Sequence, residues 1–239
     1  MQRVVRRLVP KPKSSVFICG CGHTGSSLLA RILAAHSSVF SFPYETGAFD
    51  WNERAKWHRA IIALTRVALS GRDIWVEKSP SHIHHTDKIR TWLPNAQFIV
   101  TTRDGRDVVA SLAKRHGDFE VSFKRWLRDS KASRLCLEQQ PSVLWRYEDF
   151  IDDPGDSLAA LCGFIGVPFE PDMLDYHKKQ VAWGRSRKTR ETHSLRRRAQ
   201  VNEPIRDFRG AWKETLPPEV ERRFHAGEAK ELMAYFGYA

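Results

Sequence analysis

The sequence is poor in cysteine and contains no long apolar run. It has four cysteines in 239 residues, and they are Cys19, Cys21, Cys136 and Cys162. Their spacing does not supply the ligands of a zinc site, so we expect no metal and buried, reduced thiols of the kind found in cytoplasmic proteins. No stretch approaches the roughly 18–20 apolar residues of a transmembrane helix. The basic segment 1–13 also lacks the apolar core of a signal peptide.

Acidic residues are in the minority. The chain has 39 lysines and arginines against 28 aspartates and glutamates, which gives a formal net charge of +11. Such an excess indicates an anionic ligand, acceptor or surface. Nucleic acid is the simplest partner of this kind, but no nucleic-acid-binding motif is present, and we expect none to be bound. With 41% hydrophobic residues, the chain is globular rather than disordered.

Apolar segments alternate with helical patterns along most of the chain. Strands are expected at residues 16–19, 39–42, 73–76, 96–102 and 143–145. Helices are expected at residues 28–36, 51–70, 81–93, 108–112, around 119–127, 158–165 and 218–236. This alternation predicts an α/β fold with a central parallel sheet, right-handed crossovers and flanking helices.

The length suits a single domain with a substantial core. We expect the domain to comprise residues 15–239, behind a basic N-terminal extension of residues 1–14. The pattern weakens between residues 176 and 209, where lysines and arginines gather. This basic segment is either a solvated loop or helix, or a mobile flap that closes over an anionic ligand.

A turn rich in glycine and hydroxyl side chains follows the first predicted strand. Gly20 and Gly25 fit the two glycines of the nucleotide-binding pattern G-x4-G-K-[ST], but Ser26 stands where that pattern has lysine. The backbone N–H groups of such a turn, together with the start of a helix, suit a phosphate. Without the lysine, stabilisation of a transferring γ-phosphoryl group is poor. The turn therefore predicts a cradle for a simpler phosphate, and the alternative is an ordinary strand-to-helix turn.

Three further motifs stand at the ends of predicted strands, which is where parallel sheets bind ligands. They are Glu77-Lys78-Ser79-Pro80, the segment from Arg103 to Ser111, and Arg146-Tyr147-Glu148-Asp149-Phe150. With the glycine-rich turn, these motifs resemble in order and spacing the sulfotransferases that use 3′-phosphoadenosine 5′-phosphosulfate (PAPS). The chain looks most similar to the Golgi and bacterial branch that acts on carbohydrates and tyrosine residues. The resemblance covers residues 15–169, weakens between 176 and 201, and resumes at 208–212.

The resemblance implies a P-loop-like domain in which the first loop wraps the 5′-phosphosulfate. The loop residues implied are Gly22, His23, Thr24, Gly25, Ser26 and Ser27. Arg103 and Ser111 match the pair that grips the 3′-phosphate, and a guanidinium can bind a phosphate bidentately. Arg209 resembles a later arginine of that site, and Tyr147 resembles a tyrosine near the nucleotide. From the residues alone, Arg103 could instead pair with an aspartate one or four residues on, and Tyr147 could be a core residue.

The resemblance also implies catalytic groups without a metal. Glu45, in the loop after the second strand, falls on the position of a general base, although a surface carboxylate is the alternative. His23 stands where the family commonly has arginine or lysine, so Lys78 is a second candidate for stabilising the leaving group. His84 is a candidate for a supporting role. The histidines at 82, 84 and 85 lack the spacing of a helical zinc site.

The expected reaction is transfer of the sulfuryl group of PAPS to an acceptor hydroxyl, of a carbohydrate or glycolipid. A tyrosine or small-molecule hydroxyl remains open as acceptor. A P-loop kinase is a rival that Ser26 disfavours, since that position would carry lysine. A polyanion-binding module is another, but it would leave the glycine-rich turn, Arg103 and Ser111 unexplained. The sequence does not indicate an oligomeric state.

Overall fold

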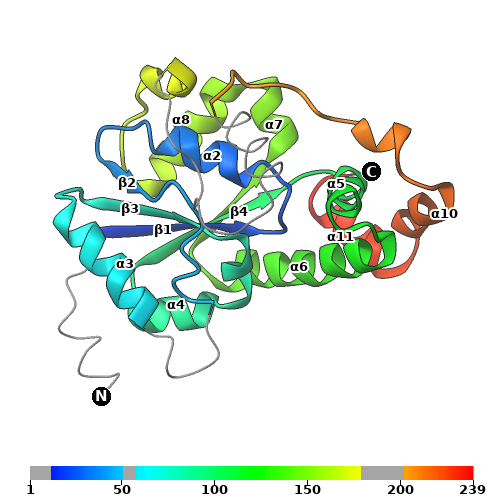
Figure 1. Ribbon diagram of the computed structural model, residues 1–239, viewed down its shortest axis with the longest axis horizontal. Coiled ribbons are helices and arrows are strands. Elements are labelled where there is room, and N and C mark those ends of the chain that lie inside the picture. The colour runs from blue at the N-terminus through cyan, green and yellow to red at the C-terminus, as the bar shows by residue number, and fades with distance from the viewer. Residues whose placement is uncertain (1–11, 51–57, 179–201, 239) are drawn as a thin grey trace.

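The computed structural model describes residues 12–50, 58–178 and 202–238. At its centre is a five-stranded parallel sheet in the order β2-β3-β1-β4-β5 (Figure 1). The strands are β1 Ser14–Gly20, β2 Val39–Ser41, β3 Ile74–Lys78, β4 Ala96–Thr102 and β5 Ser142–Arg146. The predicted α/β fold with a central parallel sheet is confirmed.

Helices cover both faces of this sheet. The α-helices are α2 Ser26–Leu33, α3 His58–Leu69, α4 Thr86–Trp92, α5 Gly105–His116, α6 Phe119–Gln139, α7 Tyr147–Asp152, α8 Pro154–Ile165, α10 Pro218–Glu221 and α11 Gly227–Tyr235. Short 3₁₀ helices occupy Pro80–His84, Pro171–Met173, Tyr176–Lys178, Ala211–Glu214 and Arg222–His225. Figure 1 shows α2, α7 and α8 above the sheet and α3, α4 and α6 below it.

The alternation of side chains along β1 explains the two apolar layers. Val16 and Ile18 are fully buried in the layer that includes α2 and α8, whereas Phe17 and Cys19 are fully buried in the layer that includes α3 and α4. Successive strand residues point to opposite faces, so a strand covered on both sides reads as an unbroken apolar run. This is why β1 was recognisable in the sequence.

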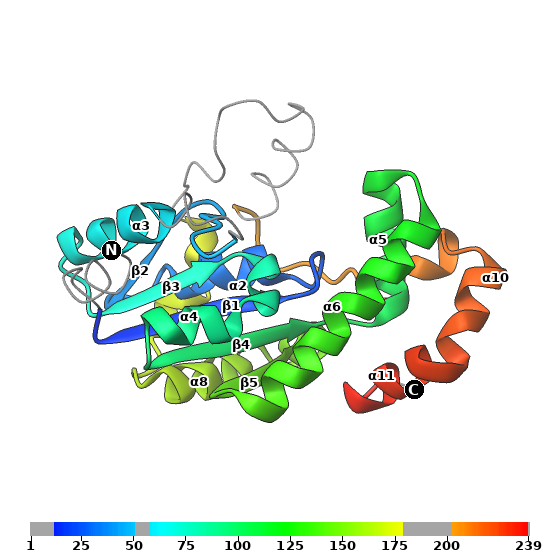
Figure 2. The ribbon, with the colours of Figure 1, turned by 90° about the horizontal axis from the view of Figure 1, so that it is seen from below.

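The C-terminal elements form a third apolar cluster, away from the sheet. Phe224 and Leu232 pack there with Val108 of α5 and Trp126 of α6. Figure 2 shows α10 and α11 beside these two long helices. Because α5 begins directly after β4, this packing holds the helix start at a fixed place next to the sheet edge.

Several predicted boundaries are wrong. The strand expected at 73–76 continues to Lys78, so Glu77 and Lys78 belong to β3. The helix expected at 81–93 is a 3₁₀ turn followed by α4, with a break at His85, where φ is −134°. The single closing helix expected at 218–236 is three short pieces, since Ala226 is extended with a φ of −136°.

Three predicted helices begin earlier than expected, and the one at 108–112 begins at Gly105 and continues to His116. The helix at 158–165 begins at Pro154, because the Asp153 carboxylate caps it by accepting a hydrogen bond from the backbone N–H of Asp156. The helix at 28–36 begins at Ser26 and ends at Leu33. Parts of three predictions lie outside the described residues: the N-terminal extension up to residue 11, the helical segment 51–57, and residues 179–201 of the basic segment.

The strand register brings the predicted motifs to one edge of the sheet. Ile18 of β1 is level with Lys78 of β3, and Gly20 is level with Thr101 of β4. Thr102 is in turn level with Arg146 of β5. The loops that leave these strands therefore start side by side, as expected for ligand-binding loops at the carboxyl ends of parallel strands.

Candidate active site

The glycine-rich turn between β1 and α2 is fixed by contacts with β4. A side chain at Gly20 would place its Cβ 2.6 Å from the Thr101 carbonyl oxygen, and its φ of 126° also favours glycine. The Thr24 hydroxyl lies 2.7 Å from the Thr101 hydroxyl and donates to the Cys21 carbonyl at 2.9 Å. Thr24 is buried. Its hydroxyl therefore ties the turn to β4, which leaves the Thr24 backbone N–H as the group available to a phosphate.

The second half of the turn opens α2. Gly25 has a φ of 86° and immediately precedes the first helical residue, Ser26. A Cβ at Gly25 would lie 2.9 Å from the Tyr147 ring, so the turn passes closely over the residues that follow β5. No side-chain hydrogen bond caps α2. Its first N–H groups thus face the turn, which is the arrangement that binds phosphates in helix N-terminal loops.

His23 connects the turn to α5. It has a positive φ of 71°, which is uncommon for a residue other than glycine. Its Nδ1 lies 2.7 Å from the Ser111 hydroxyl. The structure therefore brings together two residues that the sequence assigned to the two ends of one nucleotide. Ser111 contacts His23 rather than Arg103.

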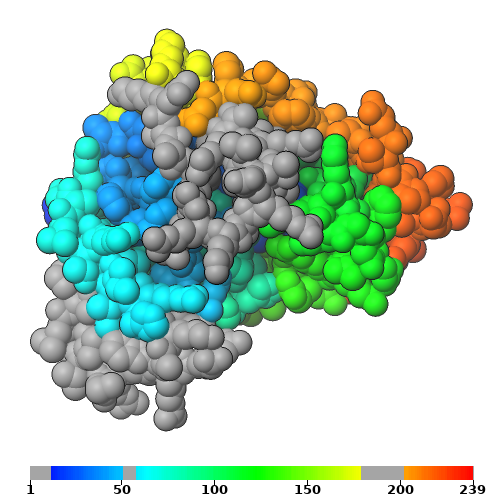
Figure 3. All heavy atoms as spheres, viewed as in Figure 1, coloured from blue at the N-terminus to red at the C-terminus, as the bar shows by residue number. Residues whose placement is uncertain are grey.

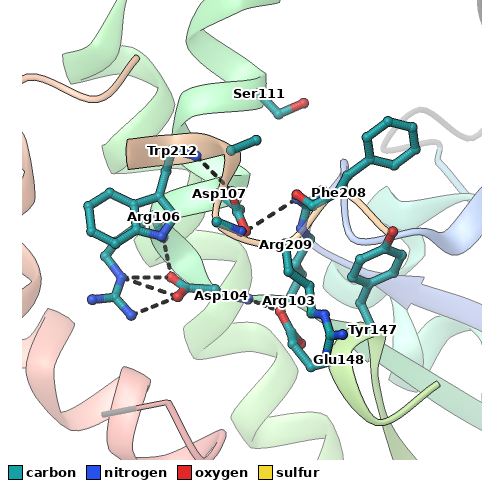
Figure 4. Close-up of polar contacts among 12 residues, drawn as sticks. Arg103, Asp104, Arg106, Asp107, Ser111, Tyr147, Glu148, Phe208, Arg209 and Trp212 are labelled. Carbon is teal, nitrogen blue, oxygen red and sulfur yellow. Dashed lines mark hydrogen bonds and ion pairs between the residues drawn. The ribbon is translucent and has the colours of Figure 1, made fainter. Parts of the chain in front are cut away.

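Arg103 lies between the end of β4 and the start of α5, near three partners (Figure 4). Its guanidinium is 3.2 Å from the Asp107 carboxylate and donates to the Phe208 carbonyl. It also lies 4.9 Å from the centre of the Tyr147 ring. The Arg103 Nε is buried and has no hydrogen-bond partner among the described residues. A buried cationic donor without a partner suits an anionic ligand, although the ion pair with Asp107 that the sequence left open is also present.

Residues 206–212 lie against this part of the site. The Tyr147 hydroxyl donates to the Arg206 carbonyl at 2.8 Å, and Asp107 accepts hydrogen bonds from the backbone N–H groups of Gly210 and Trp212, both at 2.9 Å. Arg209 pairs with Asp152 at 2.5 Å and with Asp207 at 2.9 Å. The resemblance predicts that Arg209 contributes to a phosphate site. In this structure its guanidinium pairs with these two carboxylates.

The candidate base and the candidate lysine form an ion pair. The Lys78 Nζ lies 2.6 Å from the Glu45 Oε1, and only 2% of the lysine side chain is exposed, against 44% of the glutamate side chain. Lys78 is fixed in β3 beside β1, whereas Glu45 belongs to the loop after β2. The pair therefore joins the phosphate-loop side of the sheet edge to a carboxylate that is accessible to solvent.

A buried glutamate holds the loop that carries Glu45. Glu77 Oε1 accepts hydrogen bonds from the Ser79 hydroxyl at 2.6 Å and from the Thr46 backbone N–H at 3.3 Å. Ser79 Oγ in turn accepts from the Gly47 backbone N–H at 3.2 Å. Burial raises the pKa of Glu77 to about 7, because its hydrogen bonds only partly offset the cost of desolvating the charge.

The histidines of the 3₁₀ turn have different surroundings. His82 is fully buried, its Nε2 accepts from the Phe49 backbone N–H at 3.2 Å, and burial lowers its pKa to about 4. It is therefore neutral near pH 7 and serves packing. The His84 Nε2 instead lies 2.8 Å from the Asp129 carboxylate of α6. Among the described residues, no group of three or more His, Cys, Asp or Glu side chains is arranged to hold a metal ion.

Asp129 and Arg125 were not identified from the sequence. Asp129 is buried and pairs with Arg125 and Arg128 as well as with His84. The spacing of Arg125 and Asp129 by four residues was a signal for a helix-side pair. Nothing in the local sequence indicated that this pair lies beside Gly22, where the Arg125 Nη2 is 3.2 Å from the position that a Cβ would occupy.

An open groove lies next to Glu45, with a volume of about 610 Å³. It lies between the loop after β2 and α3, and it is lined by Phe42, Tyr44, Glu45, Thr46, Gly47, Asp50, His58, Arg59, Ile62, Ala63 and Arg66. Within it Arg66 donates to the Tyr44 hydroxyl at 2.9 Å. Figure 3 shows α3, in cyan, on the same face of the molecule as α5 and α6, in green. The groove combines an aromatic wall with cations and carboxylates.

A family model described as the sulfotransferase family matches residues 50–171. The chain belongs to this family. An uncharacterized protein of Aquifex aeolicus is 23% identical over an alignment of 274 residues, and this alignment covers 93% of this chain and 36% of that protein. A putative protein-tyrosine sulfotransferase of Caenorhabditis elegans is 29% identical over 96 residues, which cover 36% of this chain and 37% of that protein. The chain thus spans little more than a third of the length of these two relatives.

Solved sulfotransferase structures share the fold. The sulfotransferase domain from the curacin biosynthetic pathway has a TM-score of 0.58 and 19% identity, over 96% of this chain and 99% of that one. A mouse sulfotransferase, SULT7A1, complexed with PAP has a TM-score of 0.58 and 11% identity, over 98% of this chain and 87% of that one. The predicted family and fold are therefore confirmed. None of the helices within residues 12–50, 58–178 and 202–238 is long and apolar enough to cross a bilayer.

Proposed function

We propose that this protein transfers the sulfuryl group of PAPS to a hydroxyl group of a carbohydrate or glycolipid. The observation that carries the proposal is the contact of 2.6 Å between Glu45 and Lys78. It joins a solvent-accessible carboxylate to a buried cation at the same sheet edge from which the phosphate-binding turn leaves. A sulfuryl transfer needs a base for the acceptor and positive charge near the leaving group, and this pair supplies both.

The described residues fit the nucleotide. Residues 22–27 offer backbone N–H groups and the serine hydroxyls to a 5′-phosphosulfate, and glycines at positions 22 and 25 allow close approach. Arg103, with its buried unpartnered Nε, fits a 3′-phosphate, and Tyr147 packs beneath its guanidinium. Ser111, in the middle of α5, contacts His23 of the turn and so links α5 to the first set of groups. When bound, PAPS supplies the sulfuryl group and departs as the bisphosphate PAP.

The protein's own groups perform the proton transfer and the orientation. Glu45 accepts the proton of the acceptor hydroxyl as the new oxygen–sulfur bond forms and the bond from sulfur to the phosphate oxygen breaks. Lys78 holds the Glu45 carboxylate in place and offers positive charge near the oxygen that takes up the departing electron pair. Glu77 and Ser79 keep the Glu45 loop against β3 through the Thr46 and Gly47 backbone.

The groove beside Glu45 supports a carbohydrate acceptor. The Tyr44 ring, the Arg66 guanidinium and the Asp50 carboxylate line it, and such a mixture of aromatic and hydrogen-bonding groups can hold sugar hydroxyls in a fixed orientation. A protein tyrosine is the second candidate, because a relative with 29% identity over part of the chain is named a putative protein-tyrosine sulfotransferase. The four free and buried cysteines support a reducing compartment such as the cytoplasm.

The experiment is to incubate the protein and PAPS with each class of acceptor in a separate reaction: glycans, glycolipids and tyrosine-containing peptides. We expect sulfate to appear by mass spectrometry on a glycan or glycolipid in the wild-type reaction and not in the reaction with Glu45→Gln. Sulfation confined to peptide tyrosines would replace the proposed acceptor with the second candidate. If the wild-type protein neither binds PAP nor modifies any acceptor, the proposed activity is wrong.

A further inference from the structure

The phosphate-binding turn contains neither lysine nor arginine between Gly20 and Ser27. The lysine position of the nucleotide-binding pattern is Ser26, and the remaining titratable side chains of the turn are His23 and Cys21. His23 contacts Ser111 through its Nδ1. Only uncharged donors, the backbone N–H groups and the Ser26 and Ser27 hydroxyls, would then accompany His23 around an anion that carries more than one negative charge, and a cationic partner from elsewhere in the fold would be expected.

Arg125 of α6 reaches this turn. Its Nη2 lies 3.2 Å from the position that a Cβ on Gly22 would occupy, so the guanidinium lies beside Gly22 in the turn. Within the described part of the chain, the only ion pair of Arg125 runs from its Nε to the Asp129 Oδ2, at 3.4 Å. Its terminal nitrogens make no hydrogen bond to any described residue.

The charges around Arg125 are not balanced. Asp129 is one carboxylate, and it faces two guanidiniums, Arg125 and Arg128, together with His84. Asp129 is nearly fully buried, so it is a fixed anchor for the three side chains. The described side chains of this cluster therefore carry a net positive charge, which would attract an anion. Arg128 has 66% of its side chain exposed, whereas Arg125 has 34% exposed and faces the turn.

From these observations we propose that Arg125 binds the 5′-phosphate of the nucleotide and replaces the cation that the turn itself lacks. Asp129 acts as the positioning residue that aims it, and His84 completes the anchor. The inference rests on the proposed function, because it takes PAPS as the nucleotide. It goes further by assigning a ligand contact to a helix that the motifs of the sequence did not include.

The test compares two nucleotides that share the 5′-phosphate. PAP carries phosphates on the 3′ and 5′ positions, and adenosine 5′-monophosphate carries only the second. We expect Arg125→Met to weaken binding of both by about tenfold or more, as for loss of a charge-assisted contact, so that the ratio of the two affinities stays constant. Calorimetric titration measures both affinities. Arg125→Lys keeps the charge and should recover part of the loss.

Arg128→Met is the matched control, because it removes a guanidinium from the same helix and from the same carboxylate without touching the turn. Its affinities should stay within about twofold of the wild type, as for an exposed ion pair. The inference is wrong if Arg125→Met leaves both affinities unchanged, if only PAP binding falls, or if Arg128→Met has an equal effect. If the wild-type protein binds neither nucleotide, the proposed function is wrong as well.

Discussion

The two sides of the candidate active site are built differently. On the nucleotide side, the turn after β1 is held by backbone geometry and short side chains, such as Gly20 against Thr101 and the hydroxyl of Thr24. On the acceptor side, the loop after β2 is held by a buried glutamate and a serine, and the groove beyond it is lined by exposed arginines. The residues of the first side are thus adjacent in the sequence, although Thr101 of β4 holds them in place, whereas the second side is assembled from residues that lie about thirty positions apart.

This difference means that the two sides can be disturbed separately. A change on the acceptor side should alter turnover or the acceptor KM while nucleotide affinity is kept, and a change on the nucleotide side should do the reverse. The ion pair between Glu45 and Lys78 is a place where the two sides meet.

The largest expected effect comes from Glu45→Gln. Glutamine keeps the shape of the side chain but removes its basicity, so turnover should fall about 10²–10⁴-fold, while the affinity for PAP stays close to that of the wild type. Steady-state kinetics and calorimetric titration measure the two quantities. Full activity in Glu45→Gln, combined with loss of activity in His23→Ala or His84→Ala, would identify a histidine as the base instead.

The next effect concerns the buried carboxylate beneath the acceptor loop. The pKa of Glu77 is about 7 in the folded protein, above its ordinary value of 4.5. Between these values the unfolded chain releases the proton while the folded chain keeps it, so the stability of the wild type falls as the pH rises through this window and levels off above it. Glu77→Gln has no such charge. Relative to that of the wild type, its free energy of unfolding should therefore rise by on the order of 3 kcal/mol from pH 4.5 to pH 8.

Denaturant unfolding at several pH values measures this difference. His82 affects the stability with the opposite sign. Its pKa of about 4 lies below the ordinary 6.5, so the free energy of unfolding that neutral His82 contributes is lost as the pH falls through that range. The comparison of variant with wild type separates the two groups, since both proteins retain His82. A difference that does not change with pH would show that Glu77 is ionised throughout.

The sheet and its order of elements could be read from the sequence, because buried parallel strands are unbroken apolar runs. The strand at 96–102 was predicted with both boundaries correct. The end of β3 was not, since Glu77 and Lys78 are charged and suggested a loop. Their burial depends on partners in the loop after β2, some thirty positions earlier in the chain. A charged residue can extend a buried strand only when such partners exist, and local sequence does not reveal them.

The site shows the same limit. The turn from Gly20 to Ser27 was recognisable because its glycines and hydroxyls are adjacent in sequence. Arg125 and Asp129 were missed because the helix pattern around them was interpreted through its apolar residues alone. Their relation to Gly22 arises from packing of α6 against β1, which neither segment encodes by itself.

On the nucleotide side, Arg103→Ala removes a charged partner of the proposed 3′-phosphate. A hydrogen bond to a charged group is worth roughly 1.5–3 kcal/mol, so affinity for PAP should fall about tenfold or more. Affinity for adenosine 5′-monophosphate, which has no 3′-phosphate, should hardly change. Calorimetric titration with both nucleotides checks this, and equal losses for the two would contradict the assignment of Arg103.

The smallest effect is expected at the outer wall of the groove. Arg66 is exposed and donates to the Tyr44 hydroxyl, so Arg66→Ala should remove one contact to the acceptor and loosen the aromatic wall. Exposed pairs are worth less than about 1 kcal/mol, and the acceptor KM should therefore rise only about two- to fivefold, with PAP affinity unchanged. Arg134→Ala is the matched control, because Arg134 is an exposed arginine paired with Glu138 on α6 and does not line the groove. If both variants raise the KM equally, the effect belongs to the overall charge of the protein and not to the groove, and the acceptor side would then extend beyond the residues that surround Glu45.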